Sequence, residues 1–140
     1  MSLKFSGKCT VKVAVLAICA TAGSVAAQQQ ITPEAFLARA NGQTLTFTDY
    51  HSSQIVGVEQ FLSTKLSVWA ETDGRCSYGN IEQRGPLVCF IYEDFPNDEN
   101  CWTPFEKNGD LLVISSATYE IQQVTKISNE PVICEGAPLS

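Results

Sequence analysis

Three glutamates, Glu59, Glu71 and Glu82, are spaced so that they would lie on successive strands of a sheet. Two carboxyl groups that face one cleft can act as acid and base or nucleophile, as in enzymes that hydrolyse glycosidic bonds. That chemistry needs a separation of about 5–10 Å and a raised pKa for one of the two groups. The pattern does not fix the face to which each side chain points. Solvent-facing positions, with Arg75 or Arg84 as a structural partner for Glu59, are the simpler interpretation.

Two further groups of residues have weaker claims to chemistry. His51, the single histidine, would have to serve any Ser/His/Asp or Cys/His mechanism. It lies in a polar turn without a nucleophile motif such as GxSxG, so we expect a solvated residue. An acidic loop offers the oxygen ligands that Ca²⁺ prefers, but its spacing is not that of an EF-hand. We predict no catalytic or metal-binding residue here, and a solvated loop that contains Glu93, Asp94, Asp98 and Glu99.

Four cysteines, Cys76, Cys89, Cys101 and Cys134, lie in the expected mature chain. An even number in a small exported domain predicts a disulfide framework. A hairpin that turns near residues 96 and 97 would place Cys89 opposite Cys101, with β-carbons about 4.5–5.5 Å apart, close to what a disulfide needs. We therefore favour Cys89–Cys101 with Cys76–Cys134. The pairing of Cys76 with Cys89 and of Cys101 with Cys134 remains the alternative.

Cofactor motifs based on cysteine are absent from the sequence. The chain contains no CxxC, which removes support for a thioredoxin-like redox site or a paired-knuckle zinc site. It contains no CxxCH, the attachment motif of covalent haem. We expect no cofactor and structural roles for all four cysteines.

The first 27 residues have the pattern of a signal peptide. Lys4, Lys8 and Lys12 precede an apolar run, 13–22, and small residues at 25–27 suit cleavage before Gln28. The apolar run is shorter than the roughly 20 residues of a membrane-spanning helix. Lipidation at Cys19 is the lesser alternative, because the bulky Ile18 precedes it. We expect a periplasmic or secreted protein whose single domain spans 28–140, with no membrane insertion after cleavage.

The charge of the mature chain limits its partners. All fifteen acidic residues and only six of the nine basic residues follow residue 27, which gives a net charge of −9. Such a domain repels nucleic acid and anionic lipid. We therefore expect no nucleic-acid partner, and a protein or a small ligand as the partner instead.

The elements that would position these residues are mainly strands. Thr32 and Pro33 suit the start of one short helix that Gly42 would end, with Phe36, Leu37 and Ala40 on its apolar face. Beyond it, apolar and polar residues alternate in short segments separated by turn signals such as Asp73-Gly74 and Asn108-Gly109. This pattern predicts an antiparallel meander of about eight strands, either a small barrel or a twisted sheet.

The order of several motifs is similar to a known pattern. NGQTLTF is followed by GVEQFL, a strand with tryptophan, C-x2-G, CFIYE, CW and a late cysteine before GAP. The set resembles an uncharacterised family of small exported proteins from alphaproteobacteria and covers about residues 41–138. The resemblance implies export and a four-cysteine β-domain, and it implies no activity or ligand. One departure is Ile81, at a position where the family tends to have an aromatic residue.

Three functional hypotheses follow. The first is a non-enzymatic periplasmic module that binds a protein, an envelope component or a small ligand. It requires an exposed apolar patch or an open pocket. The second is a hydrolase of an envelope polymer that uses two carboxylates among Glu59, Glu71 and Glu82. The third is a purely structural protein without a pocket. We expect the aromatic residues to form the core, namely Trp69, Phe90, Tyr92, Trp102, Phe105 and Tyr119.

Overall fold

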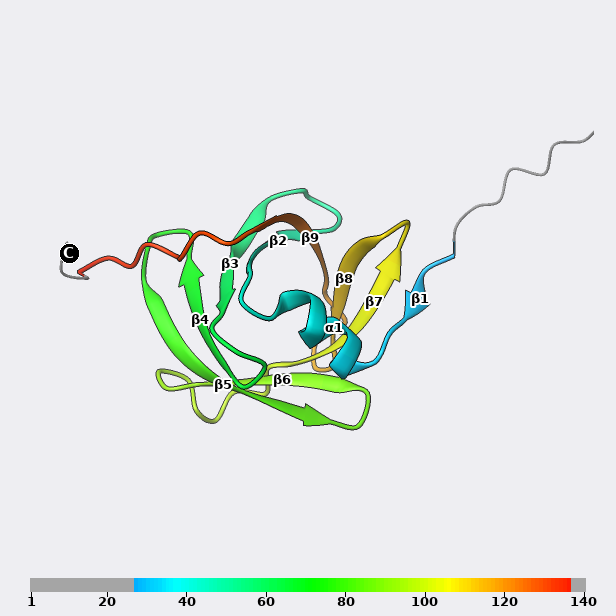
Figure 1. Ribbon diagram of the computed structural model, residues 1–140, viewed down its shortest axis with the longest axis horizontal. Helices are drawn as coiled ribbons and strands as arrows, with labels where there is room; N and C mark the ends of the chain where they lie inside the picture. The colour runs from blue at the N-terminus through cyan, green and yellow to red at the C-terminus, as the bar shows by residue number, and fades with distance from the viewer. Residues whose placement is uncertain (1–26, 137–140) are drawn as a thin grey trace, which may run out of the picture.

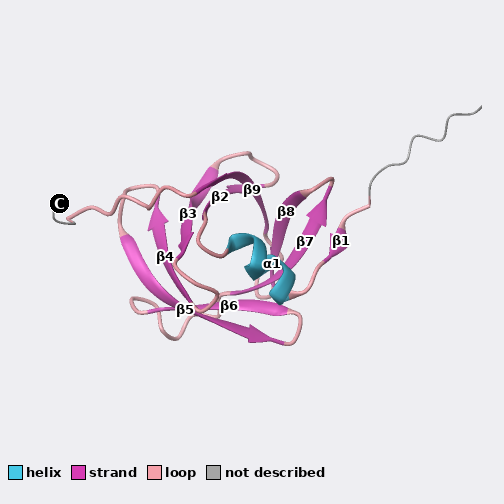
Figure 2. Cartoon of the chain, in the orientation of Figure 1, coloured by secondary structure: helices cyan, strands magenta, loops and turns pink. Residues whose placement is uncertain are grey.

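The computed structural model describes residues 27–136. The expected signal peptide lies outside the described residues, apart from its last residue, Ala27. Within the described range the chain forms one helix and nine strands (Figure 2). In chain order these are β1 (Gln29–Gln30), α1 (Pro33–Ala40), β2 (Thr44–Asp49), β3 (Ile55–Phe61), β4 (Leu66–Glu71), β5 (Cys76–Arg84), β6 (Leu87–Tyr92), β7 (Cys101–Lys107), β8 (Asp110–Ser115) and β9 (Ile121–Ser128).

Strands β2 to β9 form a closed antiparallel barrel. Each strand pairs with the next strand in the sequence, and β9 pairs with β2, so that the sheet meets itself. The predicted mainly β meander of about eight strands with a short N-terminal helix is therefore confirmed, and closure selects the barrel over the open twisted sheet. Because the barrel is closed, every second residue of each strand points into one shared interior.

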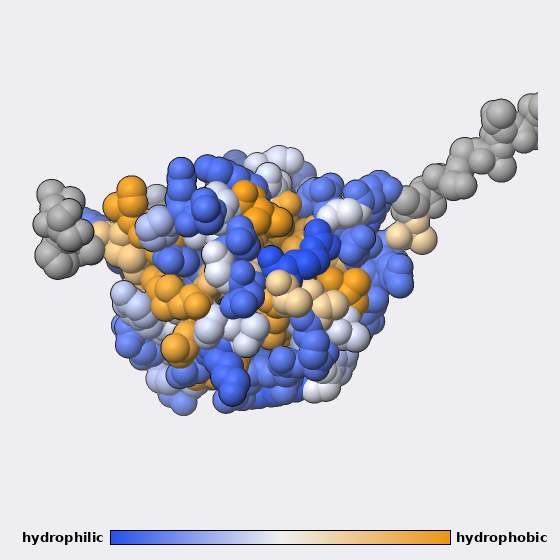
Figure 3. Space-filling model, in the orientation of Figure 1, coloured by the Kyte–Doolittle hydropathy of each residue, from blue (hydrophilic) through white to orange (hydrophobic). Residues whose placement is uncertain are grey.

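Helix α1 fills one end of the barrel. The Thr32 side chain accepts a hydrogen bond of 3.2 Å from the backbone N–H of Ala35, and Pro33 is the first helical residue, as the sequence predicts. Phe36, Leu37 and Ala40 are all at most 1% exposed. The strands surround the helix in Figure 1, and Figure 3 shows this same face covered by side chains across its middle. The helix is thus a plug held by its apolar face.

The pairing between β6 and β7 is the shortest between neighbouring strands of the barrel. Only Val88 and Cys89 of β6 have partners in β7, and Cys89 lies opposite Cys101, to which it is bonded. Beyond this point β1 takes the free edge of β7, and the Ile31 N–H donates to the carbonyl of Pro104 at 3.0 Å. Pro104 therefore lies where the β6 ladder has already ended, so its missing N–H breaks no bond to β6.

The second disulfide fastens the C-terminal segment to the barrel. Cys134 is bonded to Cys76 at the start of β5. The N–H of Glu135 donates to the Gly74 carbonyl at 2.8 Å, and the N–H of Val132 donates to the side chain of Gln60 at 3.1 Å. Both disulfides are those favoured by the expected strand register. Disulfides are typical of proteins that fold outside the reducing cytosol, and they are compatible with a secreted protein.

Reduction of the two disulfides is expected to destabilise the domain. The loop-entropy model assigns about 3 kcal/mol to the short Cys89–Cys101 loop and about 4 kcal/mol to the longer Cys76–Cys134 loop. Urea unfolding with and without reductant measures the total, and the pairwise alanine variants of each bridge separate the two contributions. Identical unfolding midpoints with and without reductant would contradict the stabilisation of the barrel by its two disulfides.

Candidate functional site

The barrel interior contains a cavity of about 240 Å³. Phe36 of α1 lines it at the plugged end, and Phe95 and Asn100 line it from the loop between β6 and β7 at the opposite end. The cavity therefore extends from the helix toward the end where the loops at 50–54, 72–75, 93–100 and 116–120 lie. Its wall is mostly apolar. The remaining lining residues are Phe47, Val56, Glu59, Trp69, Glu71, Val88, Phe90, Tyr92, Trp102, Val113 and Gln122.

Glu59 is the buried acid of this cavity. It lies in the middle of β3, opposite Leu45 of β2 and Trp69 of β4, and is 2% exposed. The hydroxyl of Tyr92 donates a hydrogen bond of 2.7 Å to its Oε2. The other oxygen, Oε1, has no hydrogen-bond partner in the protein. One oxygen of the carboxyl group is therefore held by Tyr92, whereas the other is buried without a hydrogen bond, as is the hydroxyl of Ser67.

Two small residues allow Tyr92 to reach Glu59 across two intervening strands. Gly79 of β5 is paired with both Tyr92 of β6 and Ser67 of β4. A Cβ atom on Gly79 would lie 2.8 Å from Cδ1 of Tyr92, so the ring rests directly on the glycine backbone. The phenol then extends over β5 and β4 to the carboxyl group on β3. A side chain at position 79 would displace the ring.

Burial determines the electrostatics of this pair. Desolvation raises the pKa of Glu59 to about 7, and the hydroxyls of Ser67 and Tyr92, which favour the carboxylate, offset part of the shift. Desolvation and the neighbouring acid raise the pKa of Tyr92 well above its usual value. Among the residues lining the cavity none is basic, and the titratable ones are Glu59, Tyr92 and Glu71. No protein cation therefore balances a charge on Glu59.

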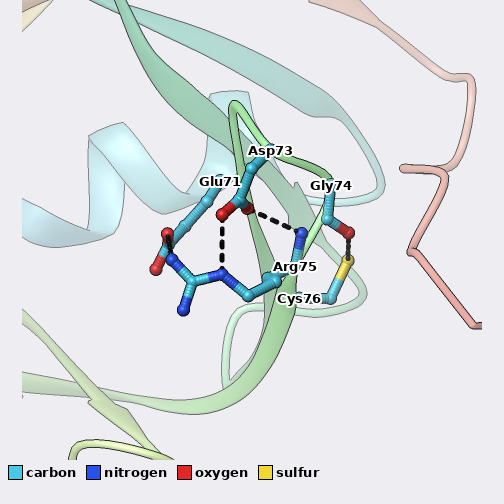
Figure 4. A network of polar contacts seen from close by, with 5 residues as sticks. All are labelled: Glu71, Asp73, Gly74, Arg75 and Cys76. Atoms are coloured by element: carbon cyan, nitrogen blue, oxygen red, sulfur yellow. Dashed lines mark hydrogen bonds and ion pairs between the residues drawn. The ribbon is translucent and has the colours of Figure 1, made fainter.

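Glu71 stands nearer the loop end of the same cavity, as the last residue of β4. Its Oε2 forms an ion pair of 2.6 Å with Arg75, whose Nε also contacts Asp73 at 2.7 Å. Figure 4 shows the Arg75 guanidinium turned toward both carboxylates. Hydrogen bonds from Arg75 hold the pKa of Asp73 below its usual value. Arg75 is thus the ion-pair partner of both Glu71 and Asp73 at the turn.

Two tryptophans complete the wall. The ring of Trp69 lies against Gly57 of β3, where a Cβ atom would come within 2.2 Å of Cζ2, and reaches Phe47 at 6.2 Å between ring centroids. The indole N–H of Trp102 donates to the Asn100 side chain at 2.5 Å. Trp69 and Trp102 are the two tryptophans of the chain, so its tryptophan fluorescence reports directly on this cavity.

The structure separates the three candidate glutamates. Glu59 and Glu71 line one cavity, whereas Glu82 lies on the outer face of β5 with 51% of its side chain exposed, paired with Arg84 at 2.6 Å. The expected solvent-facing position is therefore wrong for Glu59, and so is the expected arginine partner. Both arginines bind other acids, and the partner of Glu59 is Tyr92.

The other predicted features lie away from the cavity. His51 is exposed in the turn after β2, where its backbone N–H donates a hydrogen bond of 3.1 Å to the Asp49 carboxylate. The acidic side chains of the loop at 93–100 are exposed. In residues 27–136 no group of three or more metal-ligating side chains comes together. Tyr119 is 78% exposed and is not part of the core, unlike Phe90 and Tyr92.

The role of Tyr92 was not predicted from the sequence. Tyr92 was expected among the core aromatics, although a buried tyrosine hydroxyl needs a hydrogen-bond partner. The sequence feature that could have indicated this role is Gly79, in the strand next to that of Tyr92. Gly57 and Gly79 each have an aromatic ring against their backbone, namely that of Trp69 and that of Tyr92.

Comparisons with known proteins add no family to these observations. No family model, curated protein sequence or solved structure matches the chain. In the described part of the chain, no helix is both long enough and apolar enough to cross a membrane.

The raised pKa of Glu59 predicts a pH-dependent stability. The folded-state pKa, about 7, exceeds the ordinary value of 4.5, so the folded chain binds more protons between these values. The contribution of Glu59 to the free energy of unfolding is therefore highest below pH 4.5 and falls by about 3 kcal/mol as pH rises past 7. Glu59→Gln should remove this fall and be more stable than the wild type at pH 8, as measured by urea unfolding at pH 5 to 8.

Glu82→Gln provides the matched control, because it makes the same change of charge on the outer face. It should keep the pH dependence of the wild type. The assignment is contradicted if Glu59→Gln loses stability by the same amount as the wild type between pH 5 and pH 8.

Proposed function

We propose that the protein is a non-enzymatic binding module that holds a small, largely apolar ligand inside its barrel. The observation that carries this proposal is the cavity of about 240 Å³, whose mostly apolar wall includes one buried carboxyl group with an oxygen that has no hydrogen bond. Apolar pockets with a few converging polar groups are the usual form of small-molecule sites. The volume lies just below the roughly 300–1,000 Å³ of drug-sized sites, which favours a small molecule.

Buried polar groups support binding over a purely structural role. An unpartnered buried polar atom costs about 1–3 kcal/mol, and an apolar residue at position 59 would avoid that cost. Gly57 and Gly79 have no side chains that could pack in the interior. The rings of Trp69 and Tyr92, which line the cavity, lie against their backbones instead. A barrel required only for stability gains nothing from these features. A ligand that pairs with the Glu59 carboxyl group accounts for them.

Export to the periplasm is part of the same proposal. The two disulfides and the pattern of residues 1–27 support it. Membership of the uncharacterised alphaproteobacterial family of exported four-cysteine proteins remains a prediction from the motifs. Neither export nor membership of this family identifies the ligand.

Uptake of propylbenzene tests the binding proposal. It should shift the tryptophan emission of the folded protein, because both indoles line the cavity. Val113→Phe, which adds a ring to the cavity wall, should abolish the shift. Val58→Phe, on the outer face of β3, should leave it unchanged. Circular dichroism establishes that both variants are folded, and a wild type that takes up neither propylbenzene nor a charged analogue of similar size contradicts the proposal.

A second candidate function is hydrolysis of an envelope polymer by paired carboxylates. One observation favours it, namely that Glu59 and Glu71 line one cavity and the pKa of Glu59 is raised. Two observations weigh against it. Arg75 holds Glu71 in an ion pair, and a closed barrel has no cleft through which a polymer can pass.

Chromogenic aryl glycosides separate the two functions. We expect no release of nitrophenol from para-nitrophenyl glycosides by the wild type. Release that is lost in both Glu59→Gln and Glu71→Gln, and kept in Glu82→Gln, would replace the binding proposal with a hydrolase. The outer-face variant controls for effects of charge alone.

A further inference from the structure

We propose that the ligand of the cavity is a small organic cation, a protonated amine on an aromatic or aliphatic body, whose ammonium group pairs with the carboxylate of Glu59 at the cavity wall. This inference rests on the proposed function and specifies its ligand class. Four independent features of the structure support it.

The first feature is the missing counter-charge. Glu59 lines a cavity that, among its lining residues, contains no basic side chain, and its buried Oε1 has no hydrogen bond. A buried carboxylate is stable when a cation or several donors accompany it, and here the protein supplies the hydroxyls of Tyr92 and Ser67 but no cation among the residues that line the cavity. An ammonium group in the cavity beside this carboxylate would supply the missing positive charge through a charge-assisted hydrogen bond.

The second feature is the aromatic wall. Trp69, Phe90 and Tyr92 line the cavity together with Glu59, and the rings of Phe90 and Tyr92 are stacked 6.0 Å apart. The faces of aromatic rings attract cations, tryptophan most strongly. A charged amine with an apolar body therefore finds both of its parts complemented. A neutral ligand would use the apolar wall alone.

The third feature is the charge around the loop end. Phe95 and Asn100 line the cavity from the loop between β6 and β7, and this loop contains Glu93, Asp94, Asp98 and Glu99, all exposed. A shallow hollow beside it is lined by Glu71, Asp94 and Glu135, with Arg75 as its one basic residue. A negative entrance concentrates cations and repels anions.

The fourth feature is the size of the space. A cavity of about 240 Å³ accommodates a single ring or a short chain with one amine, and it excludes peptides and oligosaccharides. Spermine-like polycations are also disfavoured, because Glu71 is already bound to Arg75 and one carboxyl group remains for the ligand.

The test compares 2-phenylethylamine with its neutral analogue propylbenzene at pH 8, with tryptophan emission as the readout. The amine should bind at least about tenfold more tightly than propylbenzene, as expected for a charge-assisted hydrogen bond. In Glu59→Gln the amine should lose at least about tenfold in affinity while propylbenzene keeps its affinity within about twofold. Glu82→Gln should bind both probes like the wild type.

The pH profile supplies a second readout. Besides Glu59, the titratable residues that line the cavity are Tyr92 and Glu71, and Arg75 already neutralises Glu71. Binding of the cation requires ionised Glu59, so affinity should fall about tenfold per pH unit below pH 7. The affinity of propylbenzene should not follow this profile.

The outcomes separate the two proposals. If neither probe binds, the proposed function fails. If propylbenzene binds as tightly as the amine, or if Glu59→Gln leaves the affinity of the amine intact, the cation assignment fails while the binding cavity stands.

Discussion

A carboxyl group that is removed from water must be neutral or partnered, since an isolated buried charge costs several kcal/mol. Glu59, 2% exposed at the centre of the barrel, is subject to this constraint. The protein meets part of it with the Tyr92 hydroxyl and leaves Oε1 buried without a hydrogen bond. The arrangement of the interior depends on this hydrogen bond, because it fixes Tyr92 across β5 and β4 and keeps the middle of the cavity polar on one side.

Barrel closure makes this arrangement possible. The strand register brings residues that are far apart in the sequence, such as Glu59 and Tyr92, into one interior. Helix α1 fills one end of the barrel. The Cys89–Cys101 disulfide links β6 and β7 where their pairing is short. Helix α1 lies opposite the loop end of the barrel, whereas the Cys89–Cys101 bridge fastens the base of the loop at 93–100 that borders the cavity.

The sequence contained most of the fold. Period-two alternation and the glycine turns located the eight barrel strands, and Asn108-Gly109 adopts the two left-handed residues that a tight hairpin requires. The cysteine pairing could be argued from the register alone. Closure could not, because it depends on pairing between the first and last barrel strands, β2 and β9, and no local pattern records it.

The candidate site was predicted only in part. The interruption of GVEQFL by an acid singled out Glu59, but alternation alone did not decide whether it faced solvent or the interior. The assignment of Arg75 and Arg84 as its partners failed because both find closer acids within their own hairpins, Glu71 and Glu82. The contact with Tyr92 spans 33 residues and depends on a glycine in a third strand, so it required the three-dimensional register.

The titration of the Glu59 carboxyl carbon, followed by carbon-13 NMR in the free protein and with 2-phenylethylamine bound, tests the central claim most directly. In the free protein the carboxyl should titrate near pH 7, because burial disfavours its charge. With the amine bound the midpoint should move to lower pH, because the cation favours the carboxylate. A midpoint in the ordinary glutamate range that does not change when the amine is added would contradict an interior site anchored on Glu59.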